Sequence, residues 1–453
     1  MTLTEAAYWS KRFGVVIGIF IGIIVIVLLV IFYAPKNSAP AEYLTANCAC
    51  TDKKDTFISQ KLNIPSLELG SGSELVFQVE TASGQIDSLP DIVNVYAFDN
   101  PGQSLNSQLQ ATEIANNLGF NPDGIIRKDE NTYVWLDTSR NRTLEIDART
   151  MNFTMTASAD YIRNISSSQN VPSDSEAYSL AANALRQANL LDDDYTDEDT
   201  SLKDKYYIDI NPDGTYSEAS SSGEADLIRI DFKRRKSMIS ILETIENSES
   251  MISSLEKKLI NVDSDYTFVE SEEEVVYDGD RIKLYNFSTD VTYENPMKAN
   301  ISVYVGPKDS NEDADTIENI YRIEYINWPI QEYPCGTYEL ISPSEAIQKI
   351  QDGEGSLVSL IPKDDADTVV SYQTKTVKKF IIHLVTIAYY EPTEETEFLQ
   401  PIYVVSGDAY LENDETANFV YYVPAINYDT VTDKAKTTNT TDNSDTVDST
   451  LDL

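Results

Sequence analysis

The stretch that decides the fold is Phe380–Tyr390, FIIHLVTIAYY, whose residues are almost all apolar on both alternating faces. A strand with two apolar faces is typical of the centre of a sheet that is covered on both sides. Two further strand-like segments follow at Phe398–Val405 and Phe419–Val423. Because the connections are short and acidic, antiparallel hairpins are favoured over parallel crossovers. We expect these segments to be neighbouring antiparallel strands.

Three helical patterns lie upstream of strand-like sequence. The first has apolar residues at helical spacing, namely Ala111, Ile114, Ala115 and Leu118. The second begins with a capping box at 173–176, and the third repeats that box at 342–345 with proline at the first helical position. The near copies SDSEA and SPSEA indicate an internal repeat.

These patterns predict an α+β fold: an N-terminal transmembrane helix followed by repeated small antiparallel sheets, each packed by one helix. We expect the three units at 73–160, 173–333 and 334–430. Residues 236–260 look helical and lie between two strand segments. They are interpreted as a helical insertion in the second unit.

The N-terminus predicts a membrane anchor. Residues 14–33 contain no charge and are long enough, at about 1.5 Å per residue, to cross a bilayer. Basic residues at 11 and 12 place residues 1–13 in the cytoplasm and the remainder outside, as a signal-anchored, single-pass protein of the cell membrane. A cleaved signal peptide is the alternative. The four-residue spacing of Gly14, Gly18 and Gly22 is typical of helix association within membranes.

The segments that flank the predicted units are polar. Residues 34–72 are rich in Pro, Ala, Ser, Thr and Lys and are expected to form a stalk. Residues 431–453 consist mainly of Thr, Asp, Asn and Ser and are expected to be a disordered tail.

The charge of the chain limits its partners. With 34 Lys and Arg against 75 Asp and Glu, the formal net charge is −41. Such a field repels nucleic acid and anionic headgroups and favours cations or basic partners. The favoured interpretation is that the charge only keeps an exposed domain soluble. The sole basic cluster, Lys233–Lys236, is expected to pair with the chain's own acidic surface or to dock an acidic partner.

Three cysteines are too few for a disulfide framework in a chain of this length. Cys48 and Cys50 are too close to bridge comfortably. A disulfide from Cys335 to Cys48 or to Cys50 is one expectation, and free thiols are the other.

Candidate chemistry is sparse. Asp209, Asn211 and Asp213 match the first half of a calcium loop, but position twelve is Ser220 in place of the usual glutamate. A hairpin turn is the favoured interpretation, and we expect no cofactor. The only histidine, His383, lies within a predicted strand without a nucleophile motif. Asn-x-Ser/Thr sequons occur at Asn141, Asn152, Asn164, Asn286, Asn300 and Asn439.

Three segments carry family resemblances. The segment Thr143–Thr154, TLEIDARTMNFT, resembles the closing hairpin of PepSY-type domains, with Met151 in place of the turn glycine. The third unit, with SPSEAIQKIQDGEG and VTIAYYEPTEETEFLQPIYVVSGD, is similar to the YycH/YycI regulators of bacterial sensor kinases. That resemblance implies an exported α+β domain that contacts a membrane partner.

A wider resemblance covers most of residues 73–426. The segment Leu227–Arg235, the dipeptide at 295–296 and the strand at 321–329 resemble uncharacterised single-span proteins of candidate-phylum (Patescibacteria-type) bacteria. No function attaches to that group.

The sequence therefore predicts a membrane-anchored, extracytoplasmic interaction or regulatory protein that binds another envelope or membrane protein. An acidic cell-surface module for cations or a cationic ligand is the alternative. We expect no enzyme activity; a carboxylate-based envelope hydrolase is the competing reading.

Overall fold

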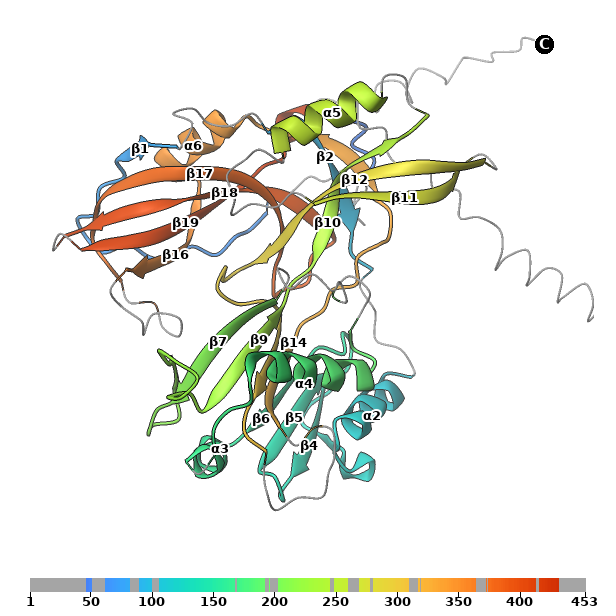
Figure 1. Cartoon of the computed structure of the whole chain (residues 1–453), viewed down its shortest axis with the longest axis vertical. Coiled ribbons are helices and arrows are strands. Elements are labelled where there is room, and N and C mark those ends of the chain that lie inside the picture. Colours follow the sequence, from blue (N-terminus) through green and yellow to red (C-terminus); the bar gives the residue numbers. More distant parts are fainter. Residues whose placement is uncertain are drawn as a thin grey trace, which may run out of the picture.

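The computed structural model consists of two lobes, each built on one large β-sheet, joined by segments that cross between them (Figure 1). It describes residues 46–50, 62–81, 89–99, 106–167, 169–191, 195, 203–244, 248–259, 269–277, 280–308, 317, 319–363, 372, 374–412 and 415–431.

The lower lobe in Figure 1 contains a nine-stranded sheet. The strands lie in the order β3 (Ile126–Arg127), β4 (Thr132–Asp137), β5 (Arg142–Asp147), β6 (Phe153–Ala157), β14 (Ile320–Tyr325), β13 (Ile301–Val305), β9 (Leu227–Phe232), β7 (Lys203–Ile210) and β8 (Tyr216–Glu218). Neighbouring strands are antiparallel throughout. In the middle, Met155 of β6 lies opposite Ile323 of β14, so segments distant in sequence close one continuous sheet.

Helices cover both faces of this sheet. On one face lie α2 (Ser107–Asn117), the short η1 (Pro122–Gly124) beside it, and α4 (Asp174–Gln187), whose alanine stripe is fully buried against β9, β13 and β14. On the other face α3 (Ala159–Ser166) packs Ile162 against the smaller cluster around Tyr304. The helix α2 ends before Gly119, which has the positive φ that favours glycine.

The upper lobe contains a ten-stranded sheet. Its main path is β10 (Arg235–Leu242), β12 (Asp280–Tyr293), β17 (Val377–Glu391), β18 (Phe398–Leu411), β19 (Thr416–Pro424) and β16 (Ser356–Pro362). Beside this path lie β1 (Phe77–Val79), β11 (Val269–Tyr277), β2 (Ile92–Ala97) and β15 (Gly336–Glu339). The pairs β17–β18 and β18–β19 are antiparallel, which confirms the expected arrangement of the three C-terminal strands.

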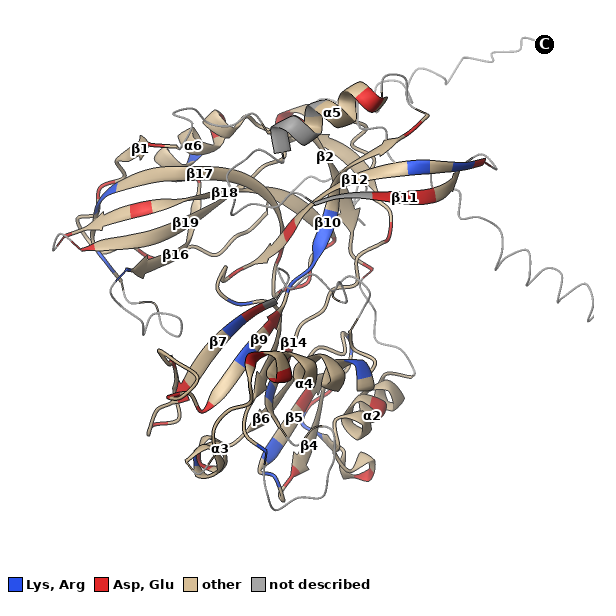
Figure 2. Cartoon of the chain, viewed as in Figure 1, with Lys and Arg blue, Asp and Glu red and all other residues tan. Residues whose placement is uncertain are grey.

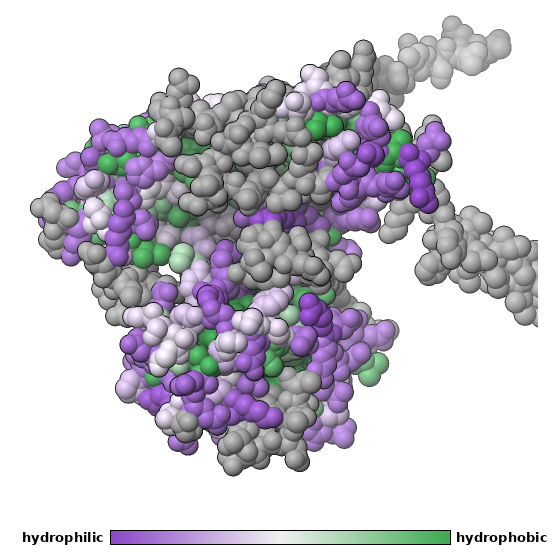
Figure 3. Space-filling view, in the orientation of Figure 1, coloured by the Kyte–Doolittle hydropathy of each residue, from purple (hydrophilic) through white to green (hydrophobic). Residues whose placement is uncertain are grey.

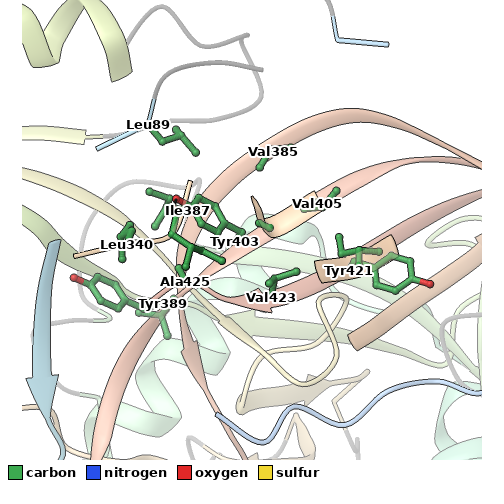
Figure 4. Packing of buried hydrophobic residues seen from close by; sticks show 14 of the residues in the cluster. Leu89, Leu340, Val385, Ile387, Tyr389, Tyr403, Val405, Tyr421, Val423 and Ala425 are labelled. Atoms are coloured by element: carbon green, nitrogen blue, oxygen red, sulfur yellow. Dashed lines mark hydrogen bonds between the residues drawn. The ribbon is translucent and has the colours of Figure 1, made fainter. Parts of the chain in front are cut away.

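The core of the upper lobe gathers on one face of these strands. In Figure 4, Val385 and Ile387 of β17 lie near Tyr403 of β18 and Val423 of β19, and all four are buried. The helix α6 (Pro343–Gln351) covers this cluster with Ala346, Ile347 and Ile350. Its first turn is capped as the sequence predicts, because the Ser342 side chain accepts a hydrogen bond from Glu345 N at 3.1 Å.

The predicted α+β fold of repeated small sheets is wrong. The structure is mostly β, with two large sheets, because strands of different predicted units pair with one another. If the sheets were small and separate, β6 and β14 would each have an exposed edge. Their pairing removes both edges. Each lobe is consequently assembled from discontinuous segments of the chain.

The membrane assignment is also corrected. No helix within the described residues is both long and apolar enough to cross a bilayer. The longest that is described, α4, has 14 residues, whereas a span needs about 20. The predicted anchor at 14–33, its Gly14, Gly18 and Gly22 stripe, residues 1–13 and most of the predicted tail lie outside the described residues. A single-pass membrane protein is therefore not supported.

The predicted helical insertion at 236–260 has two parts. Its first part is strand β10, and its second is the helix α5 (Ser248–Leu259). Isoleucines at 239 and 241 are β-branched and favour a strand. They point to the core that includes Leu255 of α5.

A disulfide fastens the N-terminal described segment to the upper lobe. It joins Cys50 to Cys335 across 285 residues and leaves Cys48 as a buried thiol. Asn47 adds two hydrogen bonds to Thr337 of β15. Its Oδ1 accepts from Thr337 N at 2.9 Å, and its backbone N–H donates to Thr337 Oγ1 at 3.1 Å.

Candidate functional site

The basic cluster of the sequence lies where the chain passes from β9 to β10, between the two lobes (Figure 2). Its four residues have different surroundings. Lys233 pairs with Asp204 of the lower lobe, and Arg235 Nε lies 2.7 Å from Asp290 Oδ1. Lys236 lies 5.8 Å from the ring centre of Tyr96.

Arg234 is the buried member of this cluster. Its Nη2 lies 2.9 Å from Glu391 Oε1, and its Nε donates to Glu391 Oε2 at 3.1 Å. Both side chains are at most 1% exposed. Burial raises the pKa of Glu391, and the guanidinium of Arg234 offsets this only in part.

Further polar groups enclose this ion pair. Arg234 Nη2 donates to Trp328 O at 2.8 Å, and its guanidinium lies 5.3 Å from the ring centre of Tyr195. Trp328 Nε1 donates to Pro392 O at 3.0 Å, and Asn300 Nδ2 donates to the same carbonyl at 3.4 Å. We call this set the lobe junction: Arg234, Glu391, Trp328, Tyr195, Asn300 and Pro392. It connects segments of both lobes and is sealed from solvent.

An open pocket of about 340 Å³ lies next to the lobe junction along β10. Strands β10, β12 and β11 form its floor, and Tyr96 of β2 with the loop at 332–334 forms its wall. These three strands have two different faces. Ile239 and Phe287 pack into the core, while Ser240, Asn286 and Ser288 line the pocket.

The floor of the pocket is a hydrogen-bonded network. Ser240 Oγ donates to Asn286 Oδ1 at 2.8 Å, and Ser237 Oγ donates to the same atom at 3.1 Å. Asn94 Nδ2 donates to Ser240 Oγ at 3.3 Å, and Tyr96 Oη donates to Ser237 O at 2.6 Å. A register shift in β10 between Ser237 and Ile239 turns both serines to this face.

Part of this polar floor has no partner. Asn286 is only 7% exposed, and its amide N–H₂ group donates to none of the described residues. The hydroxyl of Ser288 likewise has no hydrogen-bond partner among them. Both groups line the pocket, where a ligand or water can reach them.

Charge is distributed unevenly along the pocket. Arg235 and Lys236 line one part, and Glu273 and Glu332 line another. In the register, Asp290 lies opposite Arg235, while Leu284 lies opposite Glu273. Asp290 and Leu284 are six residues apart along β12, which corresponds to about 20 Å between the basic and the acidic part of the pocket.

The two glutamates are exposed, and neither forms an ion pair with a described residue. Tyr333 lies beside them. Burial raises the pKa of Tyr333, and the charges of Glu332 and Glu273 raise it further. The acidic part of the pocket therefore has uncompensated negative charge.

The calcium candidates lie in a hairpin turn. Asn211 Nδ2 donates to Thr215 Oγ1, and Asp213 Oδ1 accepts from Thr215 N at 3.0 Å, as expected for a hairpin turn. Asp209 lies against Asp226, and burial together with that neighbour raises its pKa. Within the part of the chain that the structure describes, no three His, Cys, Asp or Glu side chains are grouped to hold a metal ion.

The only histidine of the sequence is not among the residues that line the pocket. His383 occupies a bulge of β17, where its Nδ1 is 3.0 Å from Glu80 O and its Nε2 is 3.4 Å from Asp408 Oδ2. Its side chain is 43% exposed, more than expected for a strand interior. Asp408 also pairs with Lys363 at 2.8 Å.

Sequence reasoning missed the pocket residues. Ser237 and Ser240 fell within the segment predicted as helix, and Asn286 was noted only as a sequon. The buried Asn286 and Asn300 are both about 7% exposed, which argues against glycans at these two positions. The alternation of serine and isoleucine in β10 was the signal that could have revealed a strand with one polar face.

Comparison with known proteins gives no family assignment. No protein-family model and no curated protein matches the chain. A crystal structure of an uncharacterized protein from Eubacterium rectale is 12% identical with a TM-score of 0.33, and the match covers 78% of this chain and 89% of that chain. A similarity this weak carries no argument. The resemblances to PepSY-type domains and YycH/YycI regulators remain predictions.

Proposed function

We propose that this chain is an interaction protein that binds a segment of a partner polypeptide in the pocket between β10–β12–β11 and the loop at 332–334. The observation that carries the proposal is the unfilled hydrogen-bonding capacity of the pocket floor. The amide N–H₂ group of Asn286 faces the pocket without a hydrogen-bond partner in the described chain, so it can donate to a bound ligand. The pocket volume lies within the range of ligand sites.

The surroundings favour a polypeptide. The strand β11 is nine residues long and pairs with β12 on one side only within the described chain. An unpaired strand edge is a template for the backbone of a partner segment. A segment lying along β11 would pass the pocket and could place a side chain in it.

The chemistry of the pocket favours binding over catalysis. Its hydroxyls belong to Ser237, Ser240, Ser288 and two tyrosines, and none of the described residues that line it is a histidine or a cysteine. Ser237 and Ser240 donate to Asn286 Oδ1, an amide oxygen that cannot serve as a general base at neutral pH.

Panning a random peptide library against the full chain tests the proposal. We expect binders that retain affinity for Lys283→Trp, which changes the opposite face of β12, and lose it for Ser288→Trp, which fills the pocket. Circular dichroism and thermal melting verify that both variants fold. Peptides that bind Ser288→Trp as tightly as the original chain would overturn the proposal. If Ser288→Trp does not fold, Ser288→Gln serves as the smaller filling variant.

A further inference from the structure

We propose that the pocket receives a basic side chain of the partner, an arginine or a lysine, held between Glu273 and Glu332. This inference rests on the proposed function and specifies the chemistry of the bound segment. Glu273 projects from β11 and Glu332 from the loop after β14, so the two carboxylates reach the pocket from its floor and its wall.

The neighbouring acidic residues show why Glu273 is distinct. Glu272 and Glu274 lie on the opposite face of β11, where Glu272 pairs with Lys283 at 2.7 Å and Glu274 with Arg281 at 3.6 Å. Glu273 has no such partner in the described chain. Strand alternation thus separates neutralised glutamates on one face from an unneutralised one on the other.

The other groups of the pocket suit a guanidinium or an ammonium group. The ring of Tyr333 adds an aromatic surface near both carboxylates, and cations are attracted to such rings. The basic pair Arg235 and Lys236 lies at the far end of the floor, where Arg235 is bound to Asp290. A bound segment would therefore orient its basic residue towards Glu273 and away from Arg235.

The strong negative charge of the chain requires a careful control, because any cation is attracted to a protein with net charge −41. The variants Glu273→Gln and Glu272→Gln change the net charge equally and lie one residue apart on opposite faces. Only Glu273→Gln removes a carboxylate from the pocket. The comparison separates a local site from the general field.

The probe is a short peptide with blocked ends that alternates threonine and arginine, titrated calorimetrically into the full chain at physiological ionic strength. A peptide with citrulline in place of arginine is the neutral, isosteric control. We expect the arginine peptide to bind more tightly than the citrulline peptide. Glu273→Gln and Glu332→Gln each weaken its binding about fivefold, as the loss of one partly exposed ion pair does. Glu272→Gln leaves binding unchanged within about twofold.

Equal losses for Glu272→Gln and Glu273→Gln would overturn the inference, because they would show a general field effect. Equal binding of the arginine and citrulline peptides would overturn it as well. The proposed function is tested separately by the library peptides that bind the original chain but not Ser288→Trp. If these peptides contain no excess of basic residues, the pocket binds polypeptides but has no preference for a basic side chain.

Discussion

Two adjacent arginines, Arg234 and Arg235, belong to two polar clusters with different physical character. Arg234 lies in the sealed lobe junction, where Glu391, backbone carbonyls and aromatic rings surround it. Arg235 lies at the open pocket, where the amide of Asn286 and the carboxylate of Glu273 have no described partner. The difference teaches that a sealed ion pair is suited to holding the lobes together, whereas polar groups that face an open cavity remain accessible to a ligand.

The surfaces outside these clusters are less informative. On the face seen in Figure 3, the described side chains are mostly hydrophilic, with small hydrophobic patches among them. Scattered patches of this kind are normal for a folded protein and carry no functional argument.

The largest effect is expected at the lobe junction. Arg234→Met leaves the buried carboxylate of Glu391 without its counter-charge, which we expect to lower the free energy of unfolding by about 3–5 kcal/mol. Arg235→Met is the matched control, because its partner Asp290 is half exposed, and it should cost less than about 1 kcal/mol. Urea denaturation measures both. Equal losses would contradict the distinction between sealed and open clusters.

A double variant sharpens the same comparison. Arg234→Met combined with Glu391→Leu removes both buried charges, so the chain should be more stable than with Arg234→Met alone, by about 2 kcal/mol or more. The double-mutant cycle in urea gives the coupling energy. Additive losses would mean that the two side chains do not act as an ion pair.

The pocket floor should respond more weakly. Ser240→Ala removes a donor to Asn286 and an acceptor for Asn94, which we expect to cost about 1–2 kcal/mol. Ser288→Ala breaks no hydrogen bond within the described chain, so its effect should stay within about 0.5 kcal/mol. Thermal melting distinguishes the two. A larger loss for Ser288→Ala would show that this hydroxyl is structural.

The smallest effect concerns pH and the partly buried Glu324. Burial opposes the ionisation of Glu324, but Lys298 and Arg322 outweigh it and hold the pKa of Glu324 below its ordinary value. Its stabilisation is therefore present above the unfolded-state pKa of about 4.3 and is lost as the pH falls through the lower folded-state pKa.

The measurement is the free energy of unfolding of Glu324→Gln and of the original chain between neutral pH and about pH 3. We expect the variant to be less stable at neutral pH, with a difference that shrinks on acidification. A difference that is constant with pH would show that the charge of Glu324 does not contribute.

The sequence predicted the elements whose signals are local. The apolar faces of β17 and the capping box at Ser342 depend on neighbouring residues, and both are present in the structure. Met151 stands where the resembling hairpin has glycine, and it adopts the positive φ that glycine favours.

The pairing of strands from different predicted units could not be predicted from local signals. The register of β6 with β14 depends on Met155 meeting Ile323 across a long stretch of sequence. Nothing in either strand alone specifies that partner, since each alternates like any half-buried strand. The predicted small sheets failed for this reason.

The candidate site was not predictable for the same reason, because its residues are far apart in the sequence. Its floor joins Ser240 to Asn286, and its wall adds Tyr96 and Glu332 from remote segments. Each of these residues looks ordinary in sequence. Only pairing and burial show that the amide of Asn286 is held beside a cavity.

Hydrogen exchange of the full chain with and without the blocked arginine peptide tests the central claim most directly. We predict added protection in β11, in β12 and in the loop at 332–334, with no change in the segments around Arg234 and Glu391. Protection confined to other segments, or none at a saturating peptide concentration, would contradict the assignment of the open pocket as the binding site.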